Sequence, residues 1–167
     1  MHNIQLIPEC YAETEMVKIL FDNIDYLNHA SGIHEVCKIL KKNDIENYIN
    51  IGFIDKDKYN TPLYFDDFII LDRHHDLVFF KKHPSSNDYL IVVNPAIEKF
   101  LWSQLQELKK EPADYGLPSE FKKFKDLLKK ERIQYNEGYK RMILDFKHAK
   151  TSGILFIMNN IAILQQG

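Results

Sequence analysis

The chain contains few cysteines, no marked excess of charge and no long apolar run. Its 167 residues include only two cysteines, Cys10 and Cys37, which provide neither a disulfide framework nor a CxxC metal-binding spacing. We therefore expect a reducing, cytoplasmic setting. The net charge is −2, so the chain has no overall basic field of the kind that attracts nucleic acid, although a local basic patch would suffice for binding.

No segment predicts a membrane span or a signal peptide. The first residues lack a basic start followed by a long apolar stretch. Near the other end, residues 154–158 and 161–164 are apolar, but Asn159 and Asn160 interrupt them and the whole segment is too short to cross a bilayer. We expect no membrane association and interpret this segment as a buried terminal helix.

Apolar and aromatic residues are plentiful. They make up 45% and 13% of the chain, which argues against disorder and predicts a packed core. Short apolar runs predict strands at 4–7, 24–27, 51–54, 68–71, 77–81 and 89–93. Helical periodicity marks residues 14–21, 33–42 and 96–108, the last beginning at Asn94-Pro95. The order of the first five elements is typical of a parallel sheet with right-handed crossovers.

The last third of the chain has a different composition. After a break at 111–118, residues 120–150 are rich in Lys and Glu with spaced Phe, Leu and Ile, which indicates amphipathic helices. We predict one domain over 1–167, with an α/β core at 1–110 and a C-terminal helical extension at 119–167. The core has a mostly parallel central sheet flanked by helices. The lysines of 122–130 form either a solvated face or a local basic surface for a nucleic-acid backbone.

Acidic residues follow two of the predicted strands. Asp55 and Asp57 end the third strand, and the carboxyl ends of strands are where open α/β sheets bind ligands. Two acids on one side of an extended chain repel each other unless a cation lies between them, which indicates Mg²⁺ or Mn²⁺. Glu9 follows the first strand and would lie beside them if the two strands were neighbours. The alternative for the Asp pair is a solvated turn, since turns favour Asp.

Glu13 and Glu15 lie close after Glu9, in the segment that leads into the first predicted helix. The helix dipole favours acids at this position, so we assign them to the helix start or to a secondary part in the site. Cys10 lies next to Glu9, and a neighbouring carboxylate disfavours its thiolate form.

These residues together resemble the Toprim-like fold of topoisomerases, primases and several nucleases. That fold carries a Glu after its first strand, an Asp-x-Asp after a later one, and a Gly-containing turn where Gly32 lies here. The segment from Asn94 to Trp102 is similar to the Asn-Pro-x-x-Glu-x-x-Leu segment of RloB-type abortive-infection proteins, and the same resemblance extends to OLD-type nucleases. It covers roughly residues 4–102. Cys10 departs from the pattern, because the family usually has Gly there.

The resemblance implies a metal-dependent phosphoryl-transfer enzyme, specifically a nuclease acting on DNA or RNA, in a phage-defence setting. Asp55 and Asp57 would be metal ligands, Glu98 an additional ligand through water, and Glu9 the general base or a further ligand. Four basic residues flank the same edge and would bind substrate phosphates, namely Lys56, Lys58, Lys81 and His83.

Two other functions remain open. One is a non-catalytic Toprim-like binding or regulatory module that acts with a partner protein through residues 119–166, which Cys10 and the modest charge favour. The other is a haloacid-dehalogenase-like phosphatase with Asp55 as nucleophile. That class normally has Thr or Val where Tyr59 stands, and no convincing lysine-bearing or downstream Asp-Asp motif follows. The irregular spacing of the histidines makes a zinc site an unfavourable interpretation.

Overall fold

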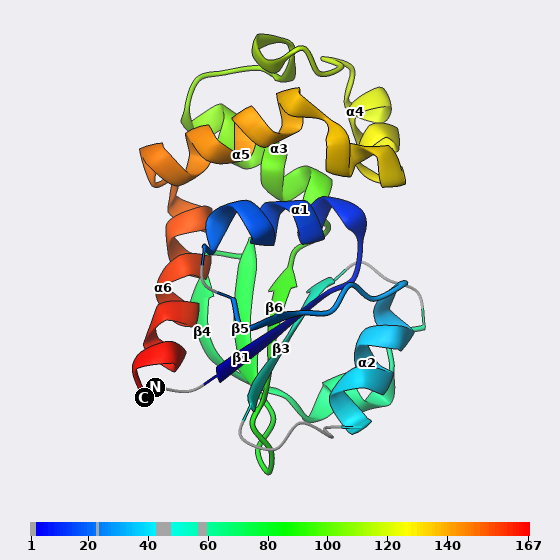
Figure 1. Cartoon of the computed structure of the whole chain (residues 1–167), viewed down its shortest axis with the longest axis vertical. Coiled ribbons are helices and arrows are strands. Elements are labelled where there is room, and N and C mark those ends of the chain that lie inside the picture. Colours follow the sequence, from blue (N-terminus) through cyan, green and yellow to red (C-terminus); the bar gives the residue numbers. More distant parts are fainter. Residues whose placement is uncertain (1–2, 23, 43–47, 57–59) are drawn as a thin grey trace.

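The computed structural model describes residues 3–22, 24–42, 48–56 and 60–167 (Figure 1). It confirms an α/β fold with a mixed six-stranded sheet, flanked by helices and followed by further helices at the C-terminal end. The strand order is β2-β1-β3-β6-β5-β4. The first four strands in that order are parallel to one another, and β5 and β4 are antiparallel to their neighbours.

The parallel half is built from alternating strands and helices. Its elements in chain order are β1 (Asn3–Pro8), α1 (Tyr11–Leu20), β2 (Tyr26–Leu27), α2 (Ile33–Lys42) and β3 (Tyr48–Asp55). Strands β1 and β3 are buried along almost their whole length, as expected for parallel strands covered on both faces. They pair directly, with Pro8 opposite Phe53, so both strands end at the same edge of the sheet.

The second half of the sheet is a meander preceded by a short 3₁₀ helix. The elements are η1 (Leu63–Asp67), β4 (Ile69–His74), β5 (Val78–Lys82) and β6 (Asp88–Val93). Strand β6 joins the two halves because it lies parallel to β3 and antiparallel to β5. Strand β4 forms the edge, and its ladder with β5 shifts register between Ile70 and Asp72.

The two faces of the sheet are covered unequally. Helix α1 and the later helices gather over one face, and α2 with η1 covers the other (Figure 1). The later elements are α3 (Ile97–Glu107), η2 (Pro112–Tyr115), α4 (Phe121–Leu128), η3 (Glu131–Tyr135), α5 (Glu137–Ala149) and α6 (Ser152–Gln166). The buried Tyr139 hydroxyl donates to the carbonyl of Ala12 at 2.6 Å, which links α5 to α1. The C-terminal helices therefore share one core with the sheet. None of the helices in the described ranges combines the length and the apolar character needed to cross a bilayer.

Several predicted elements differ in their bounds from those observed, and the strand predicted over 68–71 is β4, which runs from Ile69 to His74. The helix predicted from Thr14 begins at Tyr11, and the strand predicted over 24–27 covers only Tyr26 and Leu27. The strand predicted from Ile51 begins at Tyr48. Its polar residue Asn50 is buried and donates its side-chain amide to Asp88 of β6 at 3.2 Å, so this polar position belongs to the sheet.

Candidate functional site

Glu9 and Asp55 lie together at the carboxyl edge of the sheet. Both side chains are buried, with exposed fractions of 5% and 7%. The Glu9 amide donates to the Phe53 carbonyl at 3.1 Å, which continues the pairing of β1 with β3. The Asp55 amide donates to Glu9 Oε2 at 3.2 Å. The carboxylate of Glu9 therefore reaches across to the backbone of the neighbouring strand, so two of the predicted site residues are in direct contact.

Three helices begin at the same edge. Helix α1 starts directly after Cys10, and the amide of Gly32, just before α2, donates to the Glu9 carbonyl at 3.1 Å. The amide of Ile97, the first residue of α3, donates to Asp55 Oδ1 at 2.8 Å. Helix N-termini carry partial positive charge and unsatisfied amides. This edge is therefore suited to hold carboxylates, and equally to hold the anionic part of a ligand.

Glu13 adds a third acid to this cluster from the first turn of α1. Its side chain is fully buried, and Oε2 accepts the amides of Glu9 at 2.9 Å and Cys10 at 3.1 Å. The other oxygen, Oε1, has no hydrogen-bond partner among the described residues. Burial, followed by the nearby charges of Asp55 and Glu9, raises the pKa of Glu13 well above its usual value. Glu13 thus serves as a helix cap with one oxygen, and its other oxygen is buried close to the other two acids.

Cys10 is held in its thiol form by the same surroundings. Burial raises the pKa of Cys10 well above its usual value, and the charges of Glu13, Asp55 and Glu9 act in the same direction. The physical expectation from the sequence is confirmed, because a thiolate nucleophile requires an electropositive environment. These surroundings therefore disfavour a nucleophilic thiolate at Cys10.

The other acids proposed from the sequence are placed differently. Asp57 and Lys58 lie outside the described residues. Glu98, in the first turn of α3, is 6% exposed and forms an ion pair with Lys125 of α4, with Nζ and Oε1 3.0 Å apart. Its neighbour in the chain, Ile97, contacts Asp55, so Glu98 is near the edge but its carboxylate is engaged by a lysine.

Two of the proposed lysines line one small pocket on the face of the sheet that α2 and η1 cover. Lys56 and Lys81, together with Ile70, Phe79 and Val92, surround a space of about 90 Å³. Lys56 Nζ lies 5.0 Å from the centre of the Phe79 ring. Burial and the nearby Lys56 charge lower the pKa of Lys81. Two ammonium groups over an apolar floor form a site that favours an anion.

The side chains of His83 and Lys82 lie against aromatic rings. The His83 ring stacks on Tyr64 with centroids 5.0 Å apart and meets Phe68 edge to face at 5.2 Å. Lys82 Nζ lies 5.9 Å from the centre of the Tyr89 ring. His83 is therefore part of an aromatic cluster with residues of and next to η1. Lys56, in contrast, directly follows the proposed site residue Asp55.

A pair of stacked rings near Glu9 was not proposed from the sequence. Tyr11 and His29 stack with centroids 4.4 Å apart, and His29 Nδ1 lies 2.8 Å from Thr14 Oγ1. Burial, with a smaller contribution from the Lys18 charge, lowers the pKa of His29. Because these residues come from α1 and a loop, no spacing in the sequence indicates their contact.

The acidic cluster has the chemistry of a site for a hard cation. Its donors are carboxylate oxygens, which are the ligands that Mg²⁺ and Mn²⁺ prefer, and the unpartnered Oε1 of Glu13 is one such donor. Within the described part of the chain, no three His, Cys, Asp or Glu side chains are arranged as they stand to hold an ion. Asp57, which directly follows Lys56, lies outside that part. The donor types are those that a divalent metal prefers, whereas the described residues alone do not assemble a complete set of ligands.

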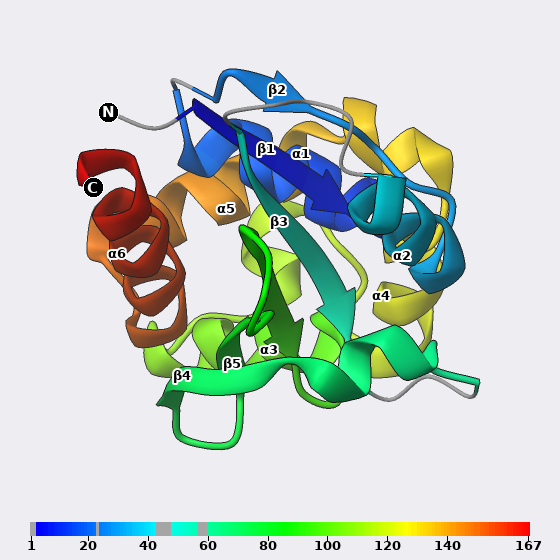
Figure 2. The ribbon, with the colours of Figure 1, turned by 90° about the horizontal axis from the view of Figure 1, so that it is seen from below.

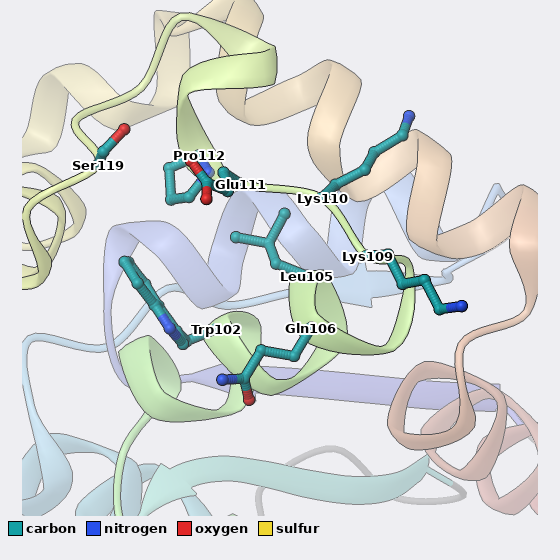
Figure 3. A pocket seen from close by; sticks show the side chains of 8 residues that line it. All are labelled: Trp102, Leu105, Gln106, Lys109, Lys110, Glu111, Pro112 and Ser119. Atoms are coloured by element: carbon teal, nitrogen blue, oxygen red, sulfur yellow. The ribbon is translucent and has the colours of Figure 1, made fainter.

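A larger hollow lies elsewhere, beside the C-terminal half of α3. It has a volume of about 550 Å³, and Trp102, Leu105 and Pro112 form part of its lining (Figure 3). The side chains of Lys109 and Lys110 extend away from Trp102 in this view. We place the candidate site at the acidic edge and not here, because titratable groups with perturbed pKa values mark functional sites better than volume alone.

Searches for known proteins that resemble this chain find no match among protein-family models, curated proteins or solved structures. The fold and the edge described above define an α/β protein with a buried acidic cluster at the carboxyl end of its parallel strands.

Proposed function

We propose that this chain is a Toprim-like, Mg²⁺- or Mn²⁺-dependent phosphoryl-transfer enzyme that cleaves DNA or RNA, in keeping with a role in phage defence. The observation that carries the proposal is the cluster of Glu9, Glu13 and Asp55, three buried acids that follow β1, lie in α1 and end β3. Each of them accepts backbone amides within the fold, but their charges still repel one another. A bound divalent cation would relieve that repulsion.

The proposal assigns each acidic residue a role in metal binding. Asp55, Glu9 and Asp57 would hold the metal, with Glu13 Oε1 as a further donor and Glu98 contributing through water. A bound divalent cation activates water and neutralises charge that develops on the phosphate oxygens.

The chain itself positions the substrate. The remaining amides at the starts of α1 and α3, and the ammonium groups of Lys56 and Lys81, would bind the phosphates of the substrate. Glu9, whose Oε2 accepts the Asp55 amide at 3.2 Å, would act as the general base.

We expect purified protein to cleave single- or double-stranded nucleic acid in millimolar Mg²⁺ or Mn²⁺ and to lose that activity in EDTA. The physical reason is that the buried acids require a cation to bring an anionic phosphate close. The measurement is gel analysis of end-labelled DNA and RNA, with readdition of metal after EDTA as the control for irreversible damage. Failure of both Mg²⁺ and Mn²⁺ to bind in titration calorimetry at millimolar concentrations would overturn the proposal.

Lys56→Ala and Lys81→Ala are expected to weaken substrate binding uniformly across sequences. Loss of one phosphate contact should lower the slope of log K against log[salt] by about 1 for each lysine. The matched control is Lys38→Ala, because Lys38 is an exposed lysine of α2 that pairs with Glu35. Fluorescence anisotropy with a labelled oligonucleotide at several salt concentrations measures the slope. An unchanged slope in both variants would remove this pair from the substrate path.

The second candidate is a non-catalytic binding or regulatory module that acts with a partner protein through residues 119–166. It is favoured by the hydrogen bonds that the acids already make within the fold, since Asp55 caps α3 and Glu98 pairs with Lys125. This alternative predicts neither metal-dependent cleavage nor metal binding. The calorimetric titration therefore separates the two candidates directly.

A further inference from the structure

The edge strand β4 exposes an apolar segment that a monomer has no evident reason to expose. Ile69, Ile70 and Leu71 follow one another and are 55%, 53% and 51% exposed. The remaining residues of β4 are exposed or half-buried as well. Natural edge strands are usually blunted by Lys, Pro or very short length, because their free amides and carbonyls recruit other strands. The apolar segment contains no Lys or Pro, and only the register shift at Leu71 and the charged residues Asp72 and Arg73 that follow it limit this edge.

The outer side of β4 is free for strand addition. In the described part of the chain, β4 pairs with β5 on one side and is the last strand of the sheet. Figure 2 shows β4 along the margin of the molecule, with only the turn that leads to β5 extending beyond it. Helix α6 lies to one side of the sheet in this view and does not cover that margin.

We propose that β4 pairs antiparallel with β4 of a second copy of this chain, about a two-fold axis near Ile70. In this register Ile70 faces Ile70 of the second copy, and Ile69 and Leu71 supply apolar surface on either side. Cross-strand apolar pairs of this kind are the stabilising units of antiparallel sheets. The proposal does not depend on the proposed enzymatic function.

The charges on either side of the apolar segment favour a second copy of this chain as the partner of β4. Arg73 lies three residues beyond Ile70, and the acids Asp66 and Asp67 lie four and three residues before it. Asp66 and Asp67 end η1, just before β4 begins at Ile69, so antiparallel pairing about Ile70 would bring Arg73 of each copy toward the acidic end of η1 in the other. The side chains of Arg73, Asp66 and Asp67 are exposed, and none forms an ion pair within the described residues. Opposite charges at both ends of an apolar centre fix the register.

The geometry predicts a closed dimer and not a fibre. Two-fold pairing uses the β4 edge of both copies at once. The opposite edge of the sheet is β2, which has only two residues, so it offers little for further addition. The register shift at Leu71 shortens the stretch that can pair. Because the interface is short, it belongs to the small, reversible class, and we expect dissociation in the micromolar range.

Sedimentation velocity over a range of concentrations tests this proposal. We expect a reversible shift from the 19.8-kDa chain to a species of twice that mass between about 1 and 100 µM. Ile70→Glu should abolish the shift, because two like charges would face each other across the axis. The new carboxylate would lie near Lys56 and Lys81, which line the same pocket as Ile70, so the variant should still fold. The matched control is Ile163→Glu, since Ile163 is 65% exposed on α6.

A charge-reversal cycle distinguishes the register from non-specific association. Arg73→Asp alone, and Asp66→Arg with Asp67→Arg, should each weaken dimerisation by several-fold, and the combination should restore it. A chain that stays monomeric at 100 µM would overturn the proposal. So would a dimer that tolerates Ile70→Glu, or one that is polydisperse and grows without limit.

Discussion

Replacing Asp55 by Asn is expected to reduce metal-dependent cleavage by at least about 100-fold while leaving the fold intact. The asparagine keeps an oxygen that accepts the Ile97 amide, so the start of α3 remains capped. What is lost is the charge that binds the cation. Removing that charge also relieves repulsion with buried Glu13, so the midpoint of thermal unfolding should stay the same or rise.

The experiment compares cleavage rate, metal affinity and unfolding midpoint in one set of variants. Asp126→Asn is the matched control, because Asp126 is an exposed acid on α4 whose loss should change none of the three. Asp55→Ala removes the cap as well and should add a loss of stability of about 1 kcal/mol. If Asp55→Asn cleaved nucleic acid as fast as the wild type, Asp55 would be only a helix cap.

Hydrophobic pattern was sufficient to predict most of the fold. Helix α2 occupies the predicted range, and β1, β3 and β6 are buried apolar strands. The predicted strand boundaries were wrong where polar residues are buried. Asp88 lies just outside the strand predicted at 89–93, yet it is the first residue of β6, is 1% exposed and accepts hydrogen bonds from Asn50, Tyr64 and Ser86. Pattern alone assigns such residues to loops, because their partners are distant in the sequence.

The site was predictable only where the sheet itself dictates proximity. Parallel pairing of β1 with β3 brings Glu9 and Asp55 together, and strand order in the sequence suggested that pairing. Side-chain direction was not predictable. Glu98 turns to Lys125, and His83 stacks on Tyr64, because helices and rings from other segments occupy the space around them. Glu13 was assigned to the helix start or to a secondary part in the site, and the burial of its second oxygen beside the other acids follows only from the packing of α1 against that edge.

Glu13→Gln is expected to stabilise the metal-free protein at neutral pH and to weaken metal binding. The amide keeps one oxygen for the Glu9 and Cys10 amides. It replaces the unpartnered carboxylate oxygen by a neutral group that can donate to the neighbouring acids. Relief of an uncompensated buried charge should raise the free energy of unfolding by about 1–3 kcal/mol. Mg²⁺ should then stabilise the variant less than the wild type, because a donor has been removed.

The pH dependence of this effect follows from the raised pKa of Glu13. In the unfolded chain the carboxyl titrates near 4.5, and in the fold it keeps its proton to a higher pH. The native state therefore binds more protons within that window, and the wild type loses stability as pH rises through it. The variant cannot ionise there, so its advantage should be small at pH 4 and largest at pH 8. Urea unfolding in EDTA at both pH values measures this difference in the free energy of unfolding. The control is Glu15→Gln, because Glu15 is another buried acid of α1 and pairs with Lys18. A variant equally destabilised at both values would show that Glu13 acts as a helix cap and nothing more.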